Sequence, residues 1–180
     1  YAFGYSYQDV YDHFSKIYNK SLYGLFDPGL NFSGIFKGER FINKTIGDSL
    51  GKRNIEESQI PYAAVATDLI TGKEVIITSG DVAEAIRASV SIPIMFMPVK
   101  SEEKLYVDGV VTTPIPILAL ENAEIDIKIA VYVSELTAFN SKAPNMMSVF
   151  LRSRNISADF IAKRSAERAD VLIKPEFNDL

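Results

Sequence analysis

The apolar run Tyr62-Ala63-Ala64-Val65-Ala66-Thr67-Asp68-Leu69 lies in the first half of a chain of 180 residues. A turn segment, Thr71-Gly72-Lys73, follows it, and residues 74–78 are again rich in β-branched side chains. Two such runs around a glycine-containing turn are typical of a β-hairpin. The sequence therefore predicts two antiparallel strands at this point.

Strands and helices alternate from this hairpin toward the C-terminus. Residues 81–89 have the pattern of a helix capped by Ser79 or Asp81, and residues 104–107 that of a strand ending at Asp108-Gly109. The later patterns predict a short helix at 115–122, a strand at 126–133, a long helix at 146–168 and a final strand at 169–174. The strand at 126–133 is apolar almost throughout, as is typical of the buried interior of a sheet. Alternating strands and helices indicate an α/β layered fold.

The part of the chain before the hairpin is predicted to be mainly helical. Ser6 is a candidate N-cap, and apolar or aromatic residues recur behind it at helical spacing up to Tyr18. His13 lies away from the centre of that stripe, so we interpret it as an exposed or half-buried helix residue without a catalytic role. A loop is predicted at 24–34 and a second amphipathic helix at 37–50.

Composition places the chain among ordinary globular proteins. Its 47% apolar and 23% charged residues suit a hydrophobic core, and we expect residues 1–180 to form a single domain. The absence of cysteine excludes disulfides and thiolate chemistry, and the single histidine excludes a multi-histidine metal site. The net charge of −4 argues against a dedicated nucleic-acid binder. We predict no metal and no cofactor, and the sequence shows no signal-peptide pattern and no apolar run long enough to span a membrane.

One segment matches the nucleophile-elbow expression G-x-S-x-G, namely Gly47-Asp48-Ser49-Leu50-Gly51. In an elbow the serine sits on a strained turn between a strand and a helix. Here an amphipathic helix pattern precedes the motif, and Lys52-Arg53-Asn54 follows it. We therefore interpret Ser49 as part of a helix end with glycine caps and not as a nucleophile. Hydrolysis of a p-nitrophenyl ester that Ser49→Ala abolishes would contradict this interpretation.

Two charged residues are candidates for a site. Asp108 follows a strand directly and precedes Gly109, and the carboxyl ends of strands are where α/β folds place reactive groups. On spacing alone, a carboxylate that caps a turn is the favoured interpretation of Asp108. Arg87, near the end of the helix at 81–89, could bind an anion, but a salt-bridged or solvated arginine is the more common arrangement.

Three groups of segments, taken together and in this order, resemble bacterial patatin-like phospholipases. They are Ala64-Val65-Ala66-Thr67-Asp68-Leu69, then Ala85-Ile86-Arg87-Ala88-Ser89 with Ser91-Ile92-Pro93, and then Val107-Asp108-Gly109 with Pro114-Ile115-Pro116. Residues 1–6 resemble the end of the helix that follows the family's serine, and residues 34–40 resemble its later loop-to-helix junction. The likeness runs from about residue 1 to residue 129 and returns weakly at 169–175.

The resemblance implies a three-layer α/β/α sandwich and a serine–aspartate dyad that cleaves lipid acyl esters through an acyl-enzyme. Asp108 matches the family's aspartate, the general base, and Gly109 the glycine that shapes its turn. Val110 departs from the small residue usual after that glycine. By the family's order, the serine of the elbow and the glycine-rich oxyanion loop come before Tyr1. We therefore expect a patatin-like catalytic domain with its N-terminal part missing, which supplies the aspartate without the nucleophile and is inactive alone.

The expected partner is a lipid or other acyl-ester substrate, with peripheral membrane contact and no nucleic acid. The expected location is cytoplasmic or at the membrane surface. The alternative is a non-catalytic interaction domain on the same scaffold, which would meet an anionic membrane or an acidic partner. Its binding face would be the basic residues of the last helix, Arg152, Arg154, Lys163, Arg164 and Arg168. The apolar residues 94–97 could line an acyl channel or pack in the core.

Overall fold

The computed structural model describes residues 1–18, 27–29, 33–121, 123–133 and 144–175. The chain forms two compact units, Tyr1–Gly109 and Val110–Leu180. The loop predicted at 24–34 lies largely outside the described residues. Whether the two units act as one domain stays a prediction.

The predicted hairpin is confirmed in the first unit. Strand β2 (Ala64–Asp68) pairs antiparallel with β3 (Lys73–Ile77), from Ala64 opposite Ile77 to Asp68 opposite Lys73. The Asp68 carboxylate closes the turn, since it accepts hydrogen bonds from the Ile70 N–H (3.1 Å) and the Thr71 hydroxyl (2.8 Å). Short-range bonds of this kind are what aspartate contributes to a turn.

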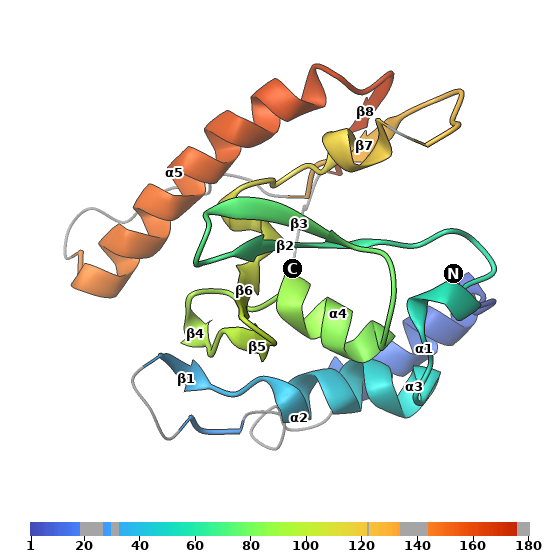
Figure 1. Ribbon diagram of the computed structural model, residues 1–180, viewed down its shortest axis with the longest axis horizontal. Coiled ribbons are helices and arrows are strands. Elements are labelled where there is room, and N and C mark those ends of the chain that lie inside the picture. The colour runs from blue at the N-terminus through green and yellow to red at the C-terminus, as the bar shows by residue number, and fades with distance from the viewer. Residues whose placement is uncertain (19–26, 30–32, 122, 134–143, 176–180) are drawn as a thin grey trace. The chain divides into compact units, whose positions relative to one another are not determined.

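A four-stranded sheet grows from the hairpin. Strand β6 (Lys104–Asp108) pairs antiparallel with β2, and β5 (Val99–Ser101) pairs with β6, which gives the order β3-β2-β6-β5 (Figure 1). A separate parallel pair joins β1 (Gly34–Phe36) to β4 (Ile94–Phe96). All five residues of β2 are buried, because β2 is an inner strand and a helix covers it.

That helix is α4 (Val82–Ser89), which packs on β2 and β6. Of the two predicted caps, the structure shows Asp81, whose carboxylate accepts the Glu84 N–H at 3.0 Å. Buried residues of α4, β2 and the 3-10 turn η3 (Ile55–Glu57) form one core cluster, made of Ile55, Ala64, Val82 and Ala85. The core of this unit therefore lies between the sheet and α4.

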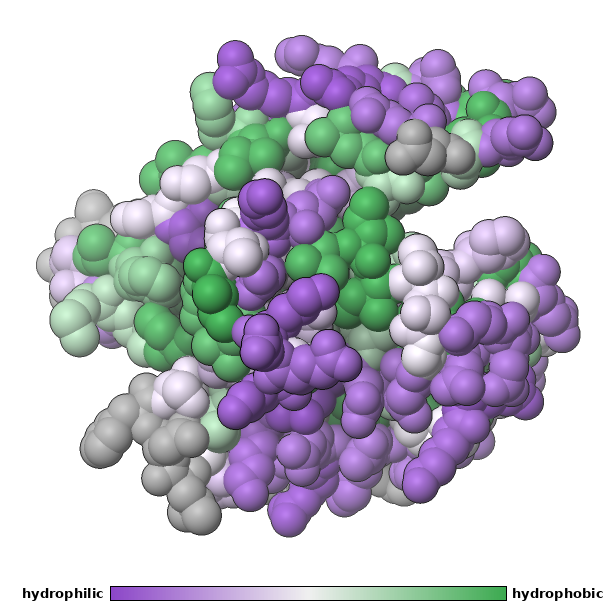
Figure 2. Space-filling view, viewed as in Figure 1, coloured by the Kyte–Doolittle hydropathy of each residue, from purple (hydrophilic) through white to green (hydrophobic). Residues whose placement is uncertain are grey.

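The helix predicted at 37–50 is confirmed as a continuous helical segment in three parts. These are α2 (Glu39–Ile42), the π-helical turn η2 (Asn43–Gly47) and α3 (Asp48–Leu50). Ile42 and Thr45 are buried, and hydrophilic side chains dominate the surface over α2 (Figure 2). Gly51 ends the segment with φ +64, so the helix end predicted around Ser49 is confirmed.

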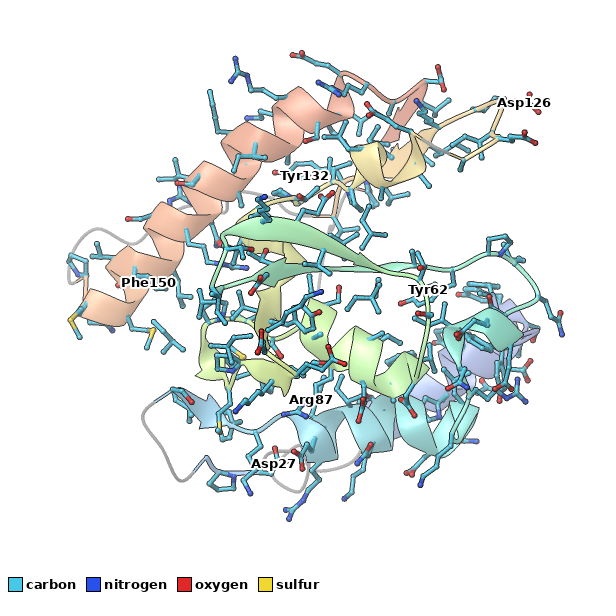
Figure 3. The ribbon with its side chains drawn as sticks, in the orientation of Figure 1. Asp27, Tyr62, Arg87, Asp126, Tyr132 and Phe150 are labelled. Atoms are coloured by element: carbon cyan, nitrogen blue, oxygen red, sulfur yellow. The ribbon has the colours of Figure 1, made fainter. Side chains whose placement is uncertain are left out.

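Asp27 holds the start of α2 (Figure 3). Its carboxylate accepts the Gly38 N–H at 2.8 Å and the Arg40 N–H at 3.0 Å, although the residue is only 9% exposed. Burial opposes ionisation, but the hydrogen bonds from Arg40 and Gly38 and the Arg40 charge outweigh it. Together they hold the pKa of Asp27 below its ordinary value of 3.8.

We expect Asp27→Asn to lower the free energy of unfolding at pH 7 by about 1.5 kcal/mol, because a charge-assisted hydrogen bond is replaced by a neutral one. A carboxyl with a depressed pKa stabilises the fold above its unfolded pKa and loses that contribution as pH falls through the folded value. The difference between wild type and variant should therefore vanish in strongly acidic solution. Denaturant unfolding at pH 7 and below pH 3 would measure it, and an undiminished difference in acid would contradict the assignment.

The helix α1 (Tyr7–Tyr18) begins where the sequence predicts it. Ser6 and Asp9 cap each other, since the Asp9 N–H donates to the Ser6 hydroxyl (3.2 Å) and the Ser6 N–H donates to the Asp9 carboxylate (2.8 Å). The aromatic residues Tyr7, Tyr11 and Phe14 are all more than 45% exposed. The aromatic stripe of α1 is therefore not part of the buried core.

The second unit contains the parallel strands β7 (Ile129–Val131) and β8 (Val171–Ile173), the long helix α5 (Met146–Ala166) and the 3-10 turn η5 (Ile117–Leu120). Its core cluster is Ile115, Ile117, Ala130 and Ala162. The Tyr132 hydroxyl and Lys163 both bind the Asp159 carboxylate of α5, at 2.5 and 2.8 Å (Figure 3). The Tyr132 bond joins α5 to the residue after β7, while the Lys163 pair lies within α5.

The prediction of a long buried strand at 126–133 is wrong in length and in burial. Only Ile129–Val131 pairs as a strand, and Ala130 is buried while Ile129 and Val131 are more than half exposed. Successive side chains of a strand point to opposite faces, and within the described residues β8 is the one strand that pairs with β7. An apolar composition alone did not reveal that one face is uncovered. The α/β class itself is confirmed.

Candidate functional site

Asp108 is the last residue of β6 and is 8% exposed. Its N–H donates to the Ser91 carbonyl at 2.9 Å, and its own carbonyl accepts the Thr67 hydroxyl at 3.1 Å. In the register of the sheet Asp108 faces Ala66 of β2. The backbone of the candidate base is thus fixed from both sides, by β2 and by the segment that follows α4.

Gly109 directly after it touches β2 so closely that no larger residue fits. A Cβ on Gly109 would lie 2.4 Å from the Val65 carbonyl oxygen and 2.9 Å from the Val65 carbonyl carbon. The chain then continues into the 3-10 turn η4 (Gly109–Val111). The sequence predicts that Gly109 shapes a turn. The structure shows why a glycine is required there, since the backbone of residue 109 lies very close to the Val65 carbonyl.

The segment after α4 completes this region. The Ser89 hydroxyl donates to the Val65 carbonyl at 2.7 Å, and the buried Ser91 hydroxyl donates to the Arg87 carbonyl at 2.7 Å. Three residues on, Ile94 has φ +74, which is a strained conformation for a β-branched residue. Within the first unit, the segments 64–69, 85–93 and 107–109 that carry the family resemblance therefore meet around the backbone of Asp108.

Arg87 is tied to a neighbouring backbone carbonyl and a carboxylate. One guanidinium nitrogen donates to the Lys37 carbonyl at 3.2 Å, and another lies 3.5 Å from the Glu39 carboxylate (Figure 3). The salt-bridged interpretation of Arg87 is confirmed. The residue links α4 to the start of α2.

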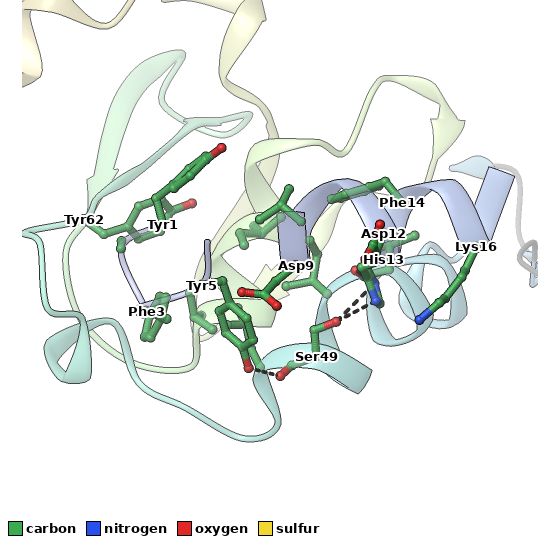
Figure 4. Close-up of a pocket in the computed structure, with 17 residues that line it drawn as sticks. Tyr1, Phe3, Tyr5, Asp9, Asp12, His13, Phe14, Lys16, Ser49 and Tyr62 are labelled. Atoms are coloured by element: carbon green, nitrogen blue, oxygen red, sulfur yellow. Dashed lines mark hydrogen bonds between the residues drawn. The ribbon is translucent and has the colours of Figure 1, made fainter. Parts of the chain in front are cut away.

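A second cluster was not predicted from the sequence. His13 of α1 lies against α3 and η2: its Nε2 is 2.7 Å from the Thr45 carbonyl oxygen, and its Nδ1 is 2.9 Å from the Ser49 hydroxyl (Figure 4). The serine oxygen is also 3.1 Å from Nε2. The two side chains are 36 residues apart in sequence. No spacing rule relates them, so only tertiary packing could reveal the contact.

The Ser49–His13 pair borders a pocket of about 630 Å³ in the first unit. Its wall is largely aromatic and aliphatic, and its polar members include the carboxylates Asp9 and Asp12. Asp108 is not among the lining residues, so this pocket and the Asp108 region are separate candidates. The pocket has the size and apolar lining of small-molecule sites.

Metal binding and membrane spanning find no support in the described part of the chain. Among those residues, no three His, Asp or Glu side chains are grouped closely enough to hold a metal ion. No helix in the same residues is both long and apolar enough to cross a membrane.

The basic face predicted for the last helix is largely engaged in local contacts. Lys163 pairs with Asp159 at 2.8 Å and Arg168 with Glu121 at 3.0 Å, while Arg164 lies over the Phe160 ring at 5.3 Å. Charges that are already paired at the surface are poor evidence for a binding face. These contacts weaken the alternative of a non-catalytic membrane-binding domain.

Comparison with known proteins agrees with the order of the segments. The sequence model of the family described as Patatin-like phospholipase matches residues 1–121. An uncharacterized NTE family protein of Mycobacterium bovis and one of Mycobacterium tuberculosis are each 33% identical over 164 residues. The matched region is 87% of this chain and 45% of each relative. A further uncharacterized NTE family protein of Mycobacterium bovis is 33% identical over 90 residues, 50% of this chain and 15% of that protein.

The chain thus spans less than half the length of these relatives. The family match contains the hairpin, α4, Asp108 and Gly109, so it includes every element that surrounds the candidate base. With 121 of its 180 residues matched, the chain belongs to the patatin-like phospholipase family.

Proposed function

We propose that the protein to which this chain belongs is a lipid acyl hydrolase, with Asp108 as its general base. The observation that carries the proposal is a nearly buried carboxylate residue whose backbone is fixed by Ser91 and Thr67, in a chain of the patatin-like phospholipase family. A catalytic base needs such a fixed position, because small displacements cost large factors in rate.

The chemistry follows a serine–aspartate dyad. A serine outside these 180 residues attacks the carbonyl carbon of a lipid ester while Asp108 accepts the hydroxyl proton. The carbon–oxygen bond to the lipid alcohol breaks, and the proton passes from Asp108 to the departing oxygen. Water then attacks the acyl-serine with Asp108 again as base, which releases the fatty acid. A glycine-rich loop, also outside the chain, would donate backbone N–H groups to the oxyanion.

Residues 94–97 could line an acyl channel or pack in the core, and the structure separates two of them. Phe96 is 7% exposed and lies against the rings of Phe36 and Phe41, so it is a core residue. Met95 is 41% exposed and remains the member of this run that could contact an acyl chain. We also propose that the substrate is a lipid acyl ester and that the protein contacts the lipid surface peripherally.

The test is to identify which bond is cleaved. The protein to which this chain belongs is incubated with vesicles of phosphatidylcholine and phosphatidylglycerol, and the products are separated by mass spectrometry. We expect free fatty acid together with lysophospholipid. Release of the phosphorylated headgroup, or no lipid product from a folded protein, would contradict the proposal.

A further inference from the structure

The contact between His13 and Ser49 has a defined proton arrangement. The Thr45 carbonyl oxygen, 2.7 Å from Nε2, can only accept a hydrogen bond, so Nε2 carries the imidazole proton. Nδ1 is then the unprotonated nitrogen, and the Ser49 oxygen lies within reach of it, 2.9 Å from Nδ1 and 3.1 Å from Nε2. A hydroxyl within reach of an unprotonated imidazole nitrogen, on a ring that is oriented through its other nitrogen, has the relation of nucleophile, base and orienting group.

The orienting carbonyl belongs to an unusual turn. Thr45 lies in η2, where the Asp48 N–H reaches back five residues to the Asn43 carbonyl. Such π-helical turns are rare and are found frequently at functional sites. Here the turn contributes a backbone carbonyl to His13, and the following residues of α3 place Ser49 on the same side (Figure 4).

The hydroxyl borders a space suited to an apolar ligand. The pocket of about 630 Å³ is walled by aromatic residues, among them Phe3, Tyr5 and Tyr62, and its volume is within the usual range for ligand sites. Asp9 and Asp12 line the same pocket (Figure 4). Hydrogen bonds from the Ser6 hydroxyl and N–H lower the pKa of Asp9, so Asp9 contributes negative charge to the wall of the pocket that His13 also lines.

We propose that Ser49 is an acyl acceptor activated by His13, and that the pocket admits small apolar carboxylic esters. The Ser49 oxygen attacks the ester carbonyl carbon as its proton moves to His13 Nδ1. The bond to the leaving alcohol breaks, and the alcohol oxygen takes the proton from Nδ1. Acyl-Ser49 and a free alcohol result, and attack by water releases the carboxylic acid and restores the serine.

The contact between Ser49 and His13 reverses the sequence-based interpretation that neither residue has a catalytic role. The proposed reactivity does not depend on a nucleophile elbow. Ser49 lies in a helix, as its sequence context predicts, and lacks the strained turn that raises an elbow serine above a sheet. The activating group comes from α1, a different part of the chain. We therefore expect slow acylation that an ester with a good leaving group reveals.

The test uses the 180-residue chain and p-nitrophenyl butyrate, with release of p-nitrophenolate and peptide mapping by mass spectrometry as readouts. We expect the butyryl group on Ser49. Ser49→Ala should abolish that adduct, and alanine is well tolerated at a helical position. His13→Gln should slow the acylation by about 10²-fold or more. An adduct only on other residues, or acylation of Ser49 at an unchanged rate in His13→Gln, would overturn the proposal.

Ser153→Ala is the matched control. Ser153 is a helical serine of α5 whose hydroxyl bonds to the Val149 carbonyl at 2.9 Å, and the chain's single histidine is far from it in sequence. This variant should be acylated like the wild type. NMR of the imidazole nitrogens tests the proposal on the wild type alone, so it does not depend on whether a variant folds. The wild type should show the Nε2-protonated tautomer of His13, and the opposite tautomer would overturn the proposal. None of these variants touches Asp108, so this inference and the proposed lipid hydrolysis can fail separately.

Discussion

If the proposed function is correct, replacing Asp108 by asparagine in the protein to which this chain belongs is expected to lower kcat for lipid acyl hydrolysis by about 10²–10⁴-fold, the range that general base catalysis contributes. Asparagine has nearly the same shape and cannot accept the serine proton. The hydrogen bonds to Ser91 and Thr67 use the backbone of Asp108, so the substitution leaves these two bonds in place. The rate of fatty-acid release should therefore fall while KM changes little.

The measurement is a kinetic comparison combined with thermal unfolding. If Asp108 only capped a turn, activity and stability would fall together, whereas a base changes activity with little change in Tm. A loss of less than tenfold in kcat would remove Asp108 from the mechanism.

Asp68→Asn is the matched control, because it alters another buried aspartate of the same sheet. Asp68 pairs with Tyr106 of β6 in the register, and its carboxylate serves the hairpin turn at Ile70 and Thr71. We expect it to lower stability by about 1–2 kcal/mol and to leave kcat near the wild-type value. A loss of activity equal to that of Asp108→Asn would mean that carboxylates in this sheet act only through stability.

Gly109→Ala is expected to lower the free energy of unfolding by about 3 kcal/mol, at the upper end of what overpacking usually costs. The added Cβ would stand 2.4 Å from the Val65 carbonyl oxygen. That carbonyl belongs to β2, whose five residues are buried and all pair with β3, and it also accepts the Ser89 hydroxyl at 2.7 Å, so it cannot move aside easily. For a chain of this size, such a loss corresponds to a fall in Tm of about 6–12 °C.

Gly47→Ala is the control for this prediction. Gly47 has helical backbone angles, φ −61 and ψ −40, and the nearest atom to an added Cβ is the Asn43 side-chain oxygen at 3.4 Å. Alanine in a helix is favoured over glycine by about 0.5–1 kcal/mol, so Tm should stay the same or rise slightly. Denaturant unfolding of both variants measures the contrast. Equal stability of Gly109→Ala and wild type would show that β2 and the start of η4 can separate.

Local patterns sufficed for the elements whose geometry is set by neighbours in sequence. The hairpin around Gly72 and the helix capped by Asp81 were predicted correctly, because turns and caps depend on bonds between residues two to four positions apart. The strand at 126–133 failed, because burial of a strand depends on what lies on each face. The apolar composition of residues 126–133 does not indicate whether another element covers each face of the strand.

The sequence likewise identified the candidate base, Asp108, but not the contacts that hold it in place. A carboxylate after a strand and before a glycine directed attention to Asp108, and the order of three groups of segments predicted the family correctly. The partners that fix its backbone, Ser91 and Thr67, lie 17 and 41 residues away in sequence. The steric demand on Gly109 likewise comes from Val65 across the sheet, so the role of that glycine could not be derived from its own neighbours.

By itself, the sequence determined the α/β class, the hairpin, the caps and the place of the chain among patatin-like phospholipases, since each depends on residue order and short-range bonds. Tertiary structure alone decided that Asp108 is nearly buried, that Gly109 is pressed against β2, and that the imidazole of His13 meets the hydroxyl of Ser49. These are contacts between segments brought together by packing. Their geometry depends on distances through space, which residue spacing along the chain does not encode.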